Sequence, residues 1–275
     1  MKEHLSKSSL RIIPGKYDSR EDYLLYLRHL FAYAFAKDTI SGNSLVLEVG
    51  CGEGYGTSLL SEHVANIVGL DVDKTAVAHA RRKYGSEKCV FTLYDGLKIP
   101  YENNMFDAVV SFQVIEHVQD DANFISEIHR VLKSNGIFMV TTPNRTLRMK
   151  PGQKPWNRFH IREYYPDELT QILKRSFSDV RMLGISGNTE VQRIELERVK
   201  QILKLISLDP LNLRKLIPDA IKQQFTKILN SMMRDKQGAE DNEDFVSKFS
   251  ITDYHVVETN VSESLDLLGI LKKSS

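Results

Sequence analysis

The chain has 275 residues, of which 41% are hydrophobic and 27% charged, and its formal net charge is +1. This composition is ordinary for a soluble globular protein and allows one α/β domain with an insertion or two small domains. The balanced charge excludes a general electrostatic attraction to nucleic acid or membranes.

Membrane-spanning and disulfide-rich classes are also disfavoured. No apolar run reaches the roughly 18 residues that a membrane span needs, and the N-terminal segment lacks the apolar core of a signal peptide. The two cysteines, Cys51 and Cys89, have no CxxC partner, so neither a disulfide nor a structural zinc site is predicted. A cytoplasmic protein is predicted.

Short apolar runs alternate with helical patterns from about residue 44 to 186, which predicts a parallel sheet with crossover helices. Strands are expected at 44–49, 66–71, 89–93, 106–112, 136–142 and 179–185. Helices are expected at 57–64, 74–84, 121–133 and 166–176, with an earlier amphipathic helix at 20–37 that would close one end of the sheet. Helix caps are expected at Asp73 or Thr75 and at Asp120 or Asp121.

The pattern changes after residue 187 to a helical periodicity. Its apolar positions include Leu213, Ile217, Ile221, Phe225, Ile228 and Met232. An acidic stretch at 240–244 is predicted to be an exposed loop, and 264–273 a terminal strand. The predicted organisation is a helical lid at 1–40, a core at 41–187, a helical insertion or cap at 188–262, and the final strand of the core sheet at 263–275.

The most specific feature is the stretch LVLEVGCGEGYG at residues 45–56. An apolar strand ends in a turn rich in glycine, and a helical pattern follows. Such a turn leaves backbone N–H groups free at a helix N-terminus, where a ligand can approach closely. The nicotinamide fingerprint G-x-G-x-x-G would require a glycine at Tyr55, so the spacing here is G-x-G-x-G instead.

This turn, with the acidic Glu48 two residues before Gly50, resembles the first motif of class I S-adenosylmethionine (SAM)-dependent methyltransferases. The resemblance implies a Rossmann-like α/β fold with a mixed seven-stranded sheet, helices on both faces and an antiparallel last strand. It implies SAM as the cofactor and S-adenosylhomocysteine (SAH) as the product. In the turn, Glu48, Gly50, Cys51 and Gly52 would bind the cofactor.

Further cofactor residues follow along the chain. Asp71, nineteen residues after Gly52, would accept hydrogen bonds from the ribose hydroxyls, with Val72 beside it; a turn or helix cap is the alternative role. By resemblance, Asp95 would accept from the adenine amino group, with Gly96 and Leu97 next to it, although a simple Asp-Gly turn is the alternative.

The end of the fourth strand would lie at the reaction end of the cofactor. The residues implied there are Ser111, Phe112 and Gln113. The sequence SFQV replaces the (D/N)PP(Y/F) motif of methyltransferases that act on nucleic-acid bases, which disfavours that reaction. Tyr17 could contact the sulfonium through a cation–π interaction, whereas core packing is expected for Tyr33.

The segment PWNRFHIREYYPDEL at 155–169 is similar to a stretch of bacterial and archaeal SAM methyltransferases associated with surface-sugar and glycan biosynthesis, with Arg158 in place of a proline. The resemblance implies a small-molecule or glycan-like acceptor, most simply a hydroxyl. A hydroxyl needs a base, for which His117 and His160 are candidates. Packing or backbone hydrogen bonding is the alternative for each.

Several alternatives stay open. Arg162 and Glu163 would hold the acceptor or pin their loop. The reaction could instead be C- or N-methylation of a quinone or an amine, or the chain could bind SAM without turnover. No metal is predicted, because the Asp/Asp/Asn set of catechol-type relatives is missing. The insertion is a solvated cap or a basic surface for anionic lipid, and the oligomeric state is open.

Overall fold

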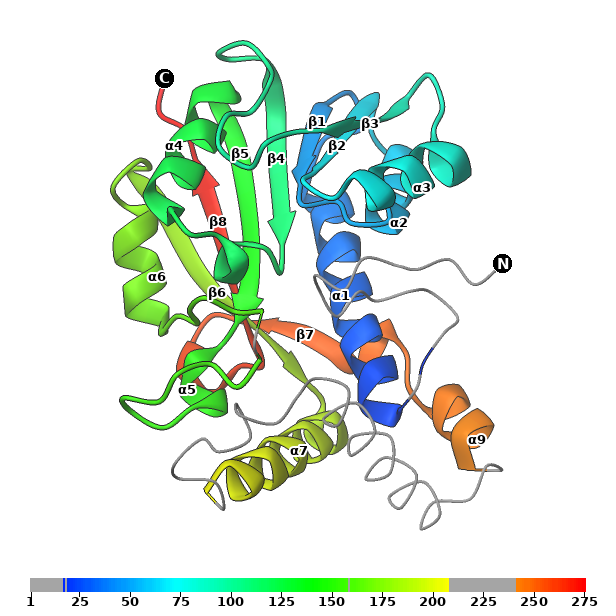
Figure 1. Ribbon diagram of the computed structural model, residues 1–275, viewed down its shortest axis with the longest axis vertical. Helices are drawn as coiled ribbons and strands as arrows, with labels where there is room; N and C mark the ends of the chain where they lie inside the picture. Colours follow the sequence, from blue (N-terminus) through cyan, green and yellow to red (C-terminus); the bar gives the residue numbers. More distant parts are fainter. Residues whose placement is uncertain (1–16, 18, 158, 208–240) are drawn as a thin grey trace.

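The computed structural model describes residues 17, 19–157, 159–207 and 241–275. In this part of the chain eight strands form one mixed sheet, in the order β3-β2-β1-β4-β5-β8-β6-β7 (Figure 1). Their bounds are β1 (Leu45–Val49), β2 (Asn66–Asp71), β3 (Cys89–Leu93), β4 (Phe106–Phe112), β5 (Leu132–Pro143), β6 (Asp179–Gly187), β7 (Tyr254–Val257) and β8 (Asp266–Lys272).

The helices alternate with these strands up to residue 187, as predicted apart from an additional short helix at 145–148. They are α1 (Arg20–Thr39), α2 (Tyr55–Ser61), α3 (Lys74–Tyr84), α4 (Asp121–Val131), α5 (Arg145–Arg148), α6 (Pro166–Leu173), α7 (Thr189–Ser207) and α9 (Asp241–Lys248), with 3₁₀ turns η1 (Ile115–His117), η3 (Ile251–Asp253) and η4 (Val261–Glu263). Asp73 and Asp120 cap α3 and α4 through their side chains, which confirms one of the two alternatives at each helix.

The strand order reverses next to β1. The chain leaves β1 towards β2 and β3 and then returns to β4 on the other side of β1, and β1 pairs in parallel with both neighbours. In such a sheet the loops after the two central strands diverge, and ligands bind in the crevice between them. The topology therefore predicts a ligand-binding site at the carboxyl ends of β1 and β4.

The predicted count of seven strands is wrong, because the segment after α9 adds β7 to the sheet. β7 pairs antiparallel with β6 from Tyr254 to Val257. The sequence of β7, YHVV, does not alternate between apolar and polar residues, so the pattern of a strand is missing there. β8 is antiparallel to both β5 and β6, as the resemblance implied.

The segment beyond residue 187 differs from the prediction in one further respect. The acidic stretch predicted to be a loop forms the first turn of α9 from Asp241 onward. The predicted apolar positions from Leu213 to Met232 lie outside the described residues.

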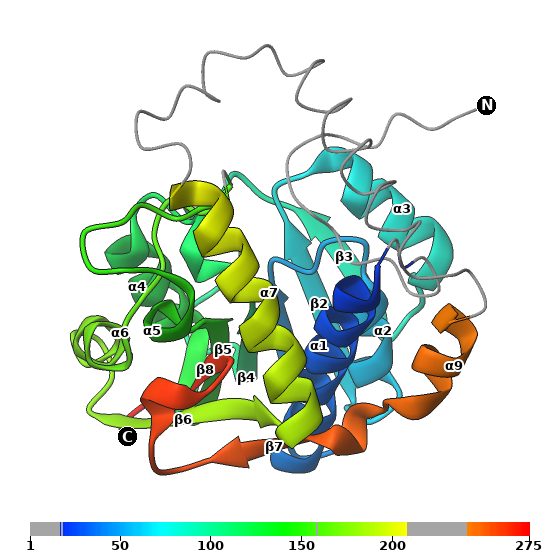
Figure 2. The same ribbon diagram turned by 90° about the horizontal axis from the view of Figure 1, so that it is seen from below.

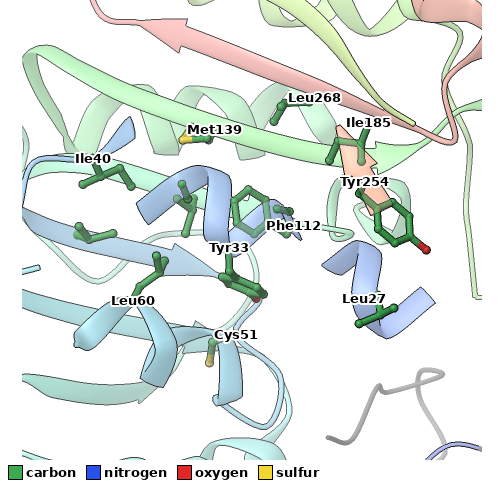
Figure 3. Close-up of a cluster of buried hydrophobic side chains, with 14 of the residues drawn as sticks. Leu27, Tyr33, Ile40, Cys51, Leu60, Phe112, Met139, Ile185, Tyr254 and Leu268 are labelled. Atoms are coloured by element: carbon green, nitrogen blue, oxygen red, sulfur yellow. The ribbon is translucent and has the colours of Figure 1, made fainter. Parts of the chain in front are cut away.

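Helices cover both faces of the sheet (Figure 2). Apolar side chains of α1, α2 and α3 form one core with alternate strand residues such as Val46, and those of α4 and α6 form a second core with residues such as Leu47. Figure 3 shows Leu27 and Tyr33 of α1 in the first core, together with Phe112 and Tyr254. Among the described helices, none is both long and apolar enough to cross a membrane.

A buried ion pair fastens α1 to the sheet. Arg28 of α1 places Nε 2.9 Å from Oδ2 of Asp266, the first residue of β8, and the two side chains are 3% and 2% exposed. Nη1 of Arg28 also lies 3.5 Å from Oε1 of Glu195 on α7. Removing one partner of such a pair leaves a buried charge uncompensated.

We therefore expect Arg28→Met to lower the free energy of unfolding by about 3–5 kcal/mol, measured by urea denaturation. The double variant Arg28→Met/Asp266→Asn should recover part of this loss, because no uncompensated carboxylate remains. Arg175→Met, at an exposed position, is the control and should change stability by less than about 0.5 kcal/mol. Equal stability of the single and double variants would contradict the assignment.

Candidate functional site

The glycine turn after β1 adopts the backbone shape that the sequence predicted. Gly50, Gly52 and Gly54 have φ values of +85°, +54° and +85°, a region that side chains disfavour. A Cβ at Gly52 would meet no atom within 4 Å, whereas one at Gly54 would lie 2.7 Å from Ala80 and Phe91. Gly52 therefore faces open space where a ligand can approach the backbone.

Glu48 lies beneath this turn. Glu48 is 1% exposed, and its carboxylate accepts hydrogen bonds of 2.5 Å from the hydroxyls of Tyr33 and Thr57. Burial raises the pKa of the Glu48 carboxyl, although these two hydrogen bonds oppose the shift. The geometry thus gives Glu48 the task of joining α1 and α2 to the turn, and its contact with the cofactor stays a prediction.

Cys51 also points into the protein. It is 5% exposed, and burial raises the pKa of its thiol well above the ordinary value. Figure 3 shows it in the same cluster as Tyr33 and Phe112. Its backbone N–H, with that of Gly50, donates to the carbonyl of Leu70, so this residue contributes backbone and packing.

Asp71 links the turn to the end of β2. Its Oδ2 accepts from the Gly52 N–H at 2.8 Å and its Oδ1 from the Asp73 N–H at 2.8 Å. These two bonds hold the carboxylate beside the open backbone of Gly52. The next residue, Val72, is 60% exposed, so its apolar side chain is accessible to a ligand beside the turn.

Asp95 and its neighbours lie beside this surface. Oδ1 of Asp95 accepts from the N–H groups of Leu97 and Lys98, and these bonds lower the pKa of the Asp95 carboxyl. Gly96 has a φ of +80° and packs against the Val72 side chain, and Leu97 is 67% exposed. Two carboxylates and two exposed apolar side chains therefore border the open side of the glycine turn.

The three residues predicted to bind the cofactor at the end of β4 have different surroundings. Ser111 is fully buried and donates its hydroxyl to the Val49 carbonyl at 2.9 Å, and Phe112 packs edge-on against Tyr33 at 5.1 Å. Gln113 has a φ of +57°, a strained conformation that is frequent at functional sites. Its Nε2 donates to Oδ2 of Asp266 at 2.9 Å.

Tyr17 joins a cluster of aromatic rings. Its ring centroid lies 5.0 Å from that of Tyr23 and 5.2 Å from that of Tyr26. Tyr26 in turn contacts Tyr55, in the helix that follows the glycine turn, at 6.1 Å. The cluster places Tyr17 near the turn, while its contact with a sulfonium stays a prediction.

The structure brings His117 and His160 together. Their ring centroids lie 4.8 Å apart in an edge-on arrangement. Nδ1 of His117 is 2.8 Å from the Phe159 carbonyl, which can only accept, so Nδ1 carries the proton and Nε2 is left as a hydrogen-bond acceptor. Burial lowers the pKa of His117. Nδ1 of His160 is 2.7 Å from Oε1 of Glu163, a carboxylate that accepts, so Nδ1 carries a proton there too and Nε2 is an acceptor in the neutral ring.

Glu116 is the third member of this cluster, and the sequence analysis missed it. One ligand atom of each of Glu116, His117 and His160 lies within 4.8 Å of the others. Oε2 of Glu116 accepts from the Thr142 hydroxyl at 2.9 Å, while Oε1 is buried without a hydrogen-bond partner among the described residues. Burial raises the pKa of Glu116 to about 7.

The loop that carries His160 is pinned to the end of β4. The Ile161 N–H donates to the Glu116 carbonyl at 2.8 Å, and Arg162 forms an ion pair with Asp121 at 2.7 Å. The geometry therefore supports loop pinning for Arg162. Glu163 is bound by Arg148 and His160 and faces the interior.

Asp266, like Glu116, was missed in the sequence. Its Oδ1 is buried without a partner among the described residues, and it lies at the start of β8, beside the carboxyl end of β5. A signal was present in both cases. Glu116 interrupts the apolar run QVIEHV, and Asp266 interrupts LDLLG, and an acid inside a buried apolar segment indicates a site or an ion pair.

Known proteins that are similar to this chain share a description. A family model described as a methyltransferase domain matches residues 47–140. A probable SAM-dependent methyltransferase of Mycolicibacterium smegmatis is 41% identical over 178 residues, which cover 64% of this chain and 66% of the relative. A ubiquinone biosynthesis O-methyltransferase of Bartonella quintana is 33% identical over 189 residues, which cover 60% of this chain and 74% of the relative.

The crystal structure of the cyclase SpnF has the same fold, with a TM-score of 0.55, 19% identity, and coverage of 90% of this chain and 82% of that one. The matched region spans 51% to 66% of the length of the mycobacterial relatives. With a glycine turn of the predicted shape and a relative matched over most of its length, the chain belongs to the SAM-dependent methyltransferase family, whose cofactor is S-adenosylmethionine.

Proposed function

We propose that the protein transfers a methyl group from SAM to a hydroxyl of a small-molecule or glycan-like acceptor. The observation that carries the proposal is the pair His117 and His160, whose rings lie 4.8 Å apart in the segments that follow β4 and β5 and whose Nδ1 atoms are held by a carbonyl and a carboxylate. A base at this place can take the proton of a hydroxyl that attacks the cofactor.

The residues around the glycine turn fit the cofactor. Gly52 allows a ligand to approach the backbone, Asp71 would accept from the ribose hydroxyls, and Asp95 from the adenine amino group. The exposed side chains of Val72 and Leu97 offer apolar surface for the flat base. Bound SAM supplies a methyl group on a positively charged sulfur, which an oxygen can displace in line.

The reaction centre would lie between the two histidines and Gln113. Orientation is the first requirement of an in-line displacement, and the strained backbone of Gln113 with its hydrogen bond to Asp266 provides a fixed wall. Glu116 brings a further acceptor atom to the same place. A site rich in acceptors and poor in donors suits a ligand that donates, such as an alcohol.

The alternatives differ in what the site must supply. C- or N-methylation of a quinone or an amine would use the same cofactor residues, and the name of the Bartonella quintana relative points to ubiquinone synthesis for that protein. A SAM-binding protein without turnover would need no base. The fixed tautomers of His117 and His160 favour catalysis over this last alternative.

We also propose that no metal takes part, on the sequence argument that the Asp/Asp/Asn set is missing. The close approach of Glu116, His117 and His160 makes a direct check necessary. Activity should survive dialysis against EDTA. Loss of activity that is restored by added Mg²⁺ or Zn²⁺ would overturn this part of the proposal.

We further propose a role for α1 as a lid, a role for the segment after residue 187 as an insertion, and a location for the protein. α1 would close over the cofactor, since Tyr33 reaches beneath the glycine turn. The basic surface proposed for contact with anionic lipid falls mainly in the undescribed residues 208–240. A cytoplasmic location and an acceptor other than nucleic acid complete the proposal.

The cofactor assignment predicts that SAH binds with micromolar affinity and that Asp71→Ala weakens binding by roughly tenfold to a hundredfold, because charge-assisted hydrogen bonds are worth about 1.5–3 kcal/mol. Isothermal titration calorimetry measures both. Asp179→Ala, at an exposed position on β6, is the control and should bind as the wild type does. Absence of SAH binding in the wild type would refute the cofactor assignment for the isolated chain.

The acceptor assignment predicts that His117→Ala and His160→Ala keep SAH affinity and that at least one loses turnover by about 10²-fold or more. Release of SAH from SAM is measured with octyl glucoside, a hydroquinone and a primary amine as probes. Turnover of the amine alone would favour the N-methylation alternative. Full activity of both variants would remove histidine base catalysis.

The raised pKa of Glu116 predicts a pH-dependent gain of stability in Glu116→Gln. The pKa of Glu116 is higher in the folded state than in the unfolded chain, because ionisation is unfavourable in the buried site. The wild type therefore loses stability as the pH rises from the pKa of the unfolded chain to about 7, the pKa in the folded state. The variant should be more stable than the wild type by on the order of 3 kcal/mol at pH 8 and equally stable at pH 4, measured by urea denaturation. Glu87→Gln, at an exposed position, should show no such difference, and a gain independent of pH would contradict the assignment.

A further inference from the structure

His117 and His160 differ in the group that holds Nδ1. For His117 that group is the backbone carbonyl of Phe159, a neutral acceptor, at 2.8 Å. For His160 it is the carboxylate of Glu163, at 2.7 Å. A carboxylate stabilises the positive charge that an imidazole gains when Nε2 takes a proton, and it does so far more strongly than a carbonyl does.

The Glu163 carboxylate is itself held in place. Its side chain is 0% exposed, and Arg148 donates Nε to Oε2 at 2.8 Å and Nη2 to Oε1 at 3.2 Å. The Arg148 guanidinium stacks over the ring of Trp156, 4.3 Å from its centroid. Two donors and an aromatic face therefore leave this carboxylate little freedom to rotate.

The charge of Glu163 is kept in spite of its burial. Burial works to raise the pKa of this carboxyl, but the hydrogen bond from His160 and the charge and hydrogen bond of Arg148 outweigh it, so the pKa lies below the ordinary value. His117 has the opposite environment, because burial lowers its pKa and only weaker effects oppose this. An ionised carboxylate therefore bonds directly to the His160 ring, whereas the surroundings of His117 favour its neutral form.

Resting on the proposed function, we propose that His160 is the base that takes the acceptor's proton, and that Glu163 and Arg148 are the positioning residues that aim its Nε2. His117 stays neutral and accepts a hydrogen bond that orients the acceptor.

The step balances. The acceptor O–H bond breaks and its proton passes to Nε2 of His160, while the oxygen forms a bond to the methyl carbon. The electron pair of the broken carbon–sulfur bond stays on sulfur, and SAH leaves as a neutral thioether. The new imidazolium charge lies next to Glu163, so the site never holds an unpaired buried cation.

Glu163→Gln tests the positioning role with little change of shape. The Arg148 Nε contact is the shorter of the two, so the amide oxygen should turn to Arg148 and the amide NH₂ to His160. His160 would then have to accept at Nδ1 and carry its proton on Nε2, which abolishes the base. Glu168→Gln is the matched control, because Glu168 is exposed and binds only the Tyr165 N–H.

The tautomers are read by ¹H–¹⁵N correlation spectroscopy of histidine-labelled protein with SAH added, with peaks assigned by His117→Gln and His160→Gln. The expected wild-type result is a proton on Nδ1 in both rings. Glu163→Gln should move the His160 proton to Nε2 and leave His117 unchanged. A wild-type His160 protonated on Nε2, or a His160 tautomer unaffected by Glu163→Gln, would overturn the proposal.

Turnover of the octyl glucoside probe adds a second readout. Glu163→Gln should lower kcat by on the order of 10²-fold and change SAH affinity and the KM for the probe by less than about threefold. His160→Ala should lose kcat to a greater extent than His117→Ala, and the reverse order would assign the base to His117. Failure of the wild type to bind SAH would refute the proposed function instead, and the tautomers would still decide the positioning role.

Discussion

The buried contact between Arg28 and Asp266 connects the separate parts of the molecule at the site. Asp266 begins β8, accepts from Gln113 at the end of β4 and pairs with Arg28 of α1. Arg28 in turn reaches Glu195 on α7. A buried charge is tolerated only where its partners stay in place, so this contact fixes α1 and α7 relative to the end of β4.

A second buried acid does the same for the cofactor side. Glu48 holds α1 and α2 to the glycine turn through Tyr33 and Thr57. The residues that give the turn its shape are therefore enclosed, while Val72 and Leu97 are exposed. This separation explains why the predicted cofactor residues include both supporting and surface positions.

The acceptor side depends on a loop that folds back on the end of β4. The backbone bond from Ile161 to Glu116 brings His160 next to His117, although forty-three residues separate them in the sequence. The resulting cluster brings together ligand atoms of two imidazoles and of the Glu116 carboxyl, whose Oε1 is buried without a hydrogen-bond partner among the described residues. Such a cluster needs a proton or a donating ligand, and the carboxylate of Glu163 bonds directly to the ring of His160.

The sequence by itself determined the core of the fold and the presence of the glycine turn after β1. Strand runs, helix caps such as Asp73 and the glycine spacing are local patterns, and local patterns depend on neighbouring residues alone. The tertiary structure decided the rest. The strand β7, the supporting role of Glu48 and the participation of Glu116 and Asp266 all depend on contacts between segments far apart in the chain. The orientation of His160 by Glu163 and Arg148 required a loop whose path is set by those contacts, because a side chain's partner and burial, which decide its charge and its function, are properties of the folded chain.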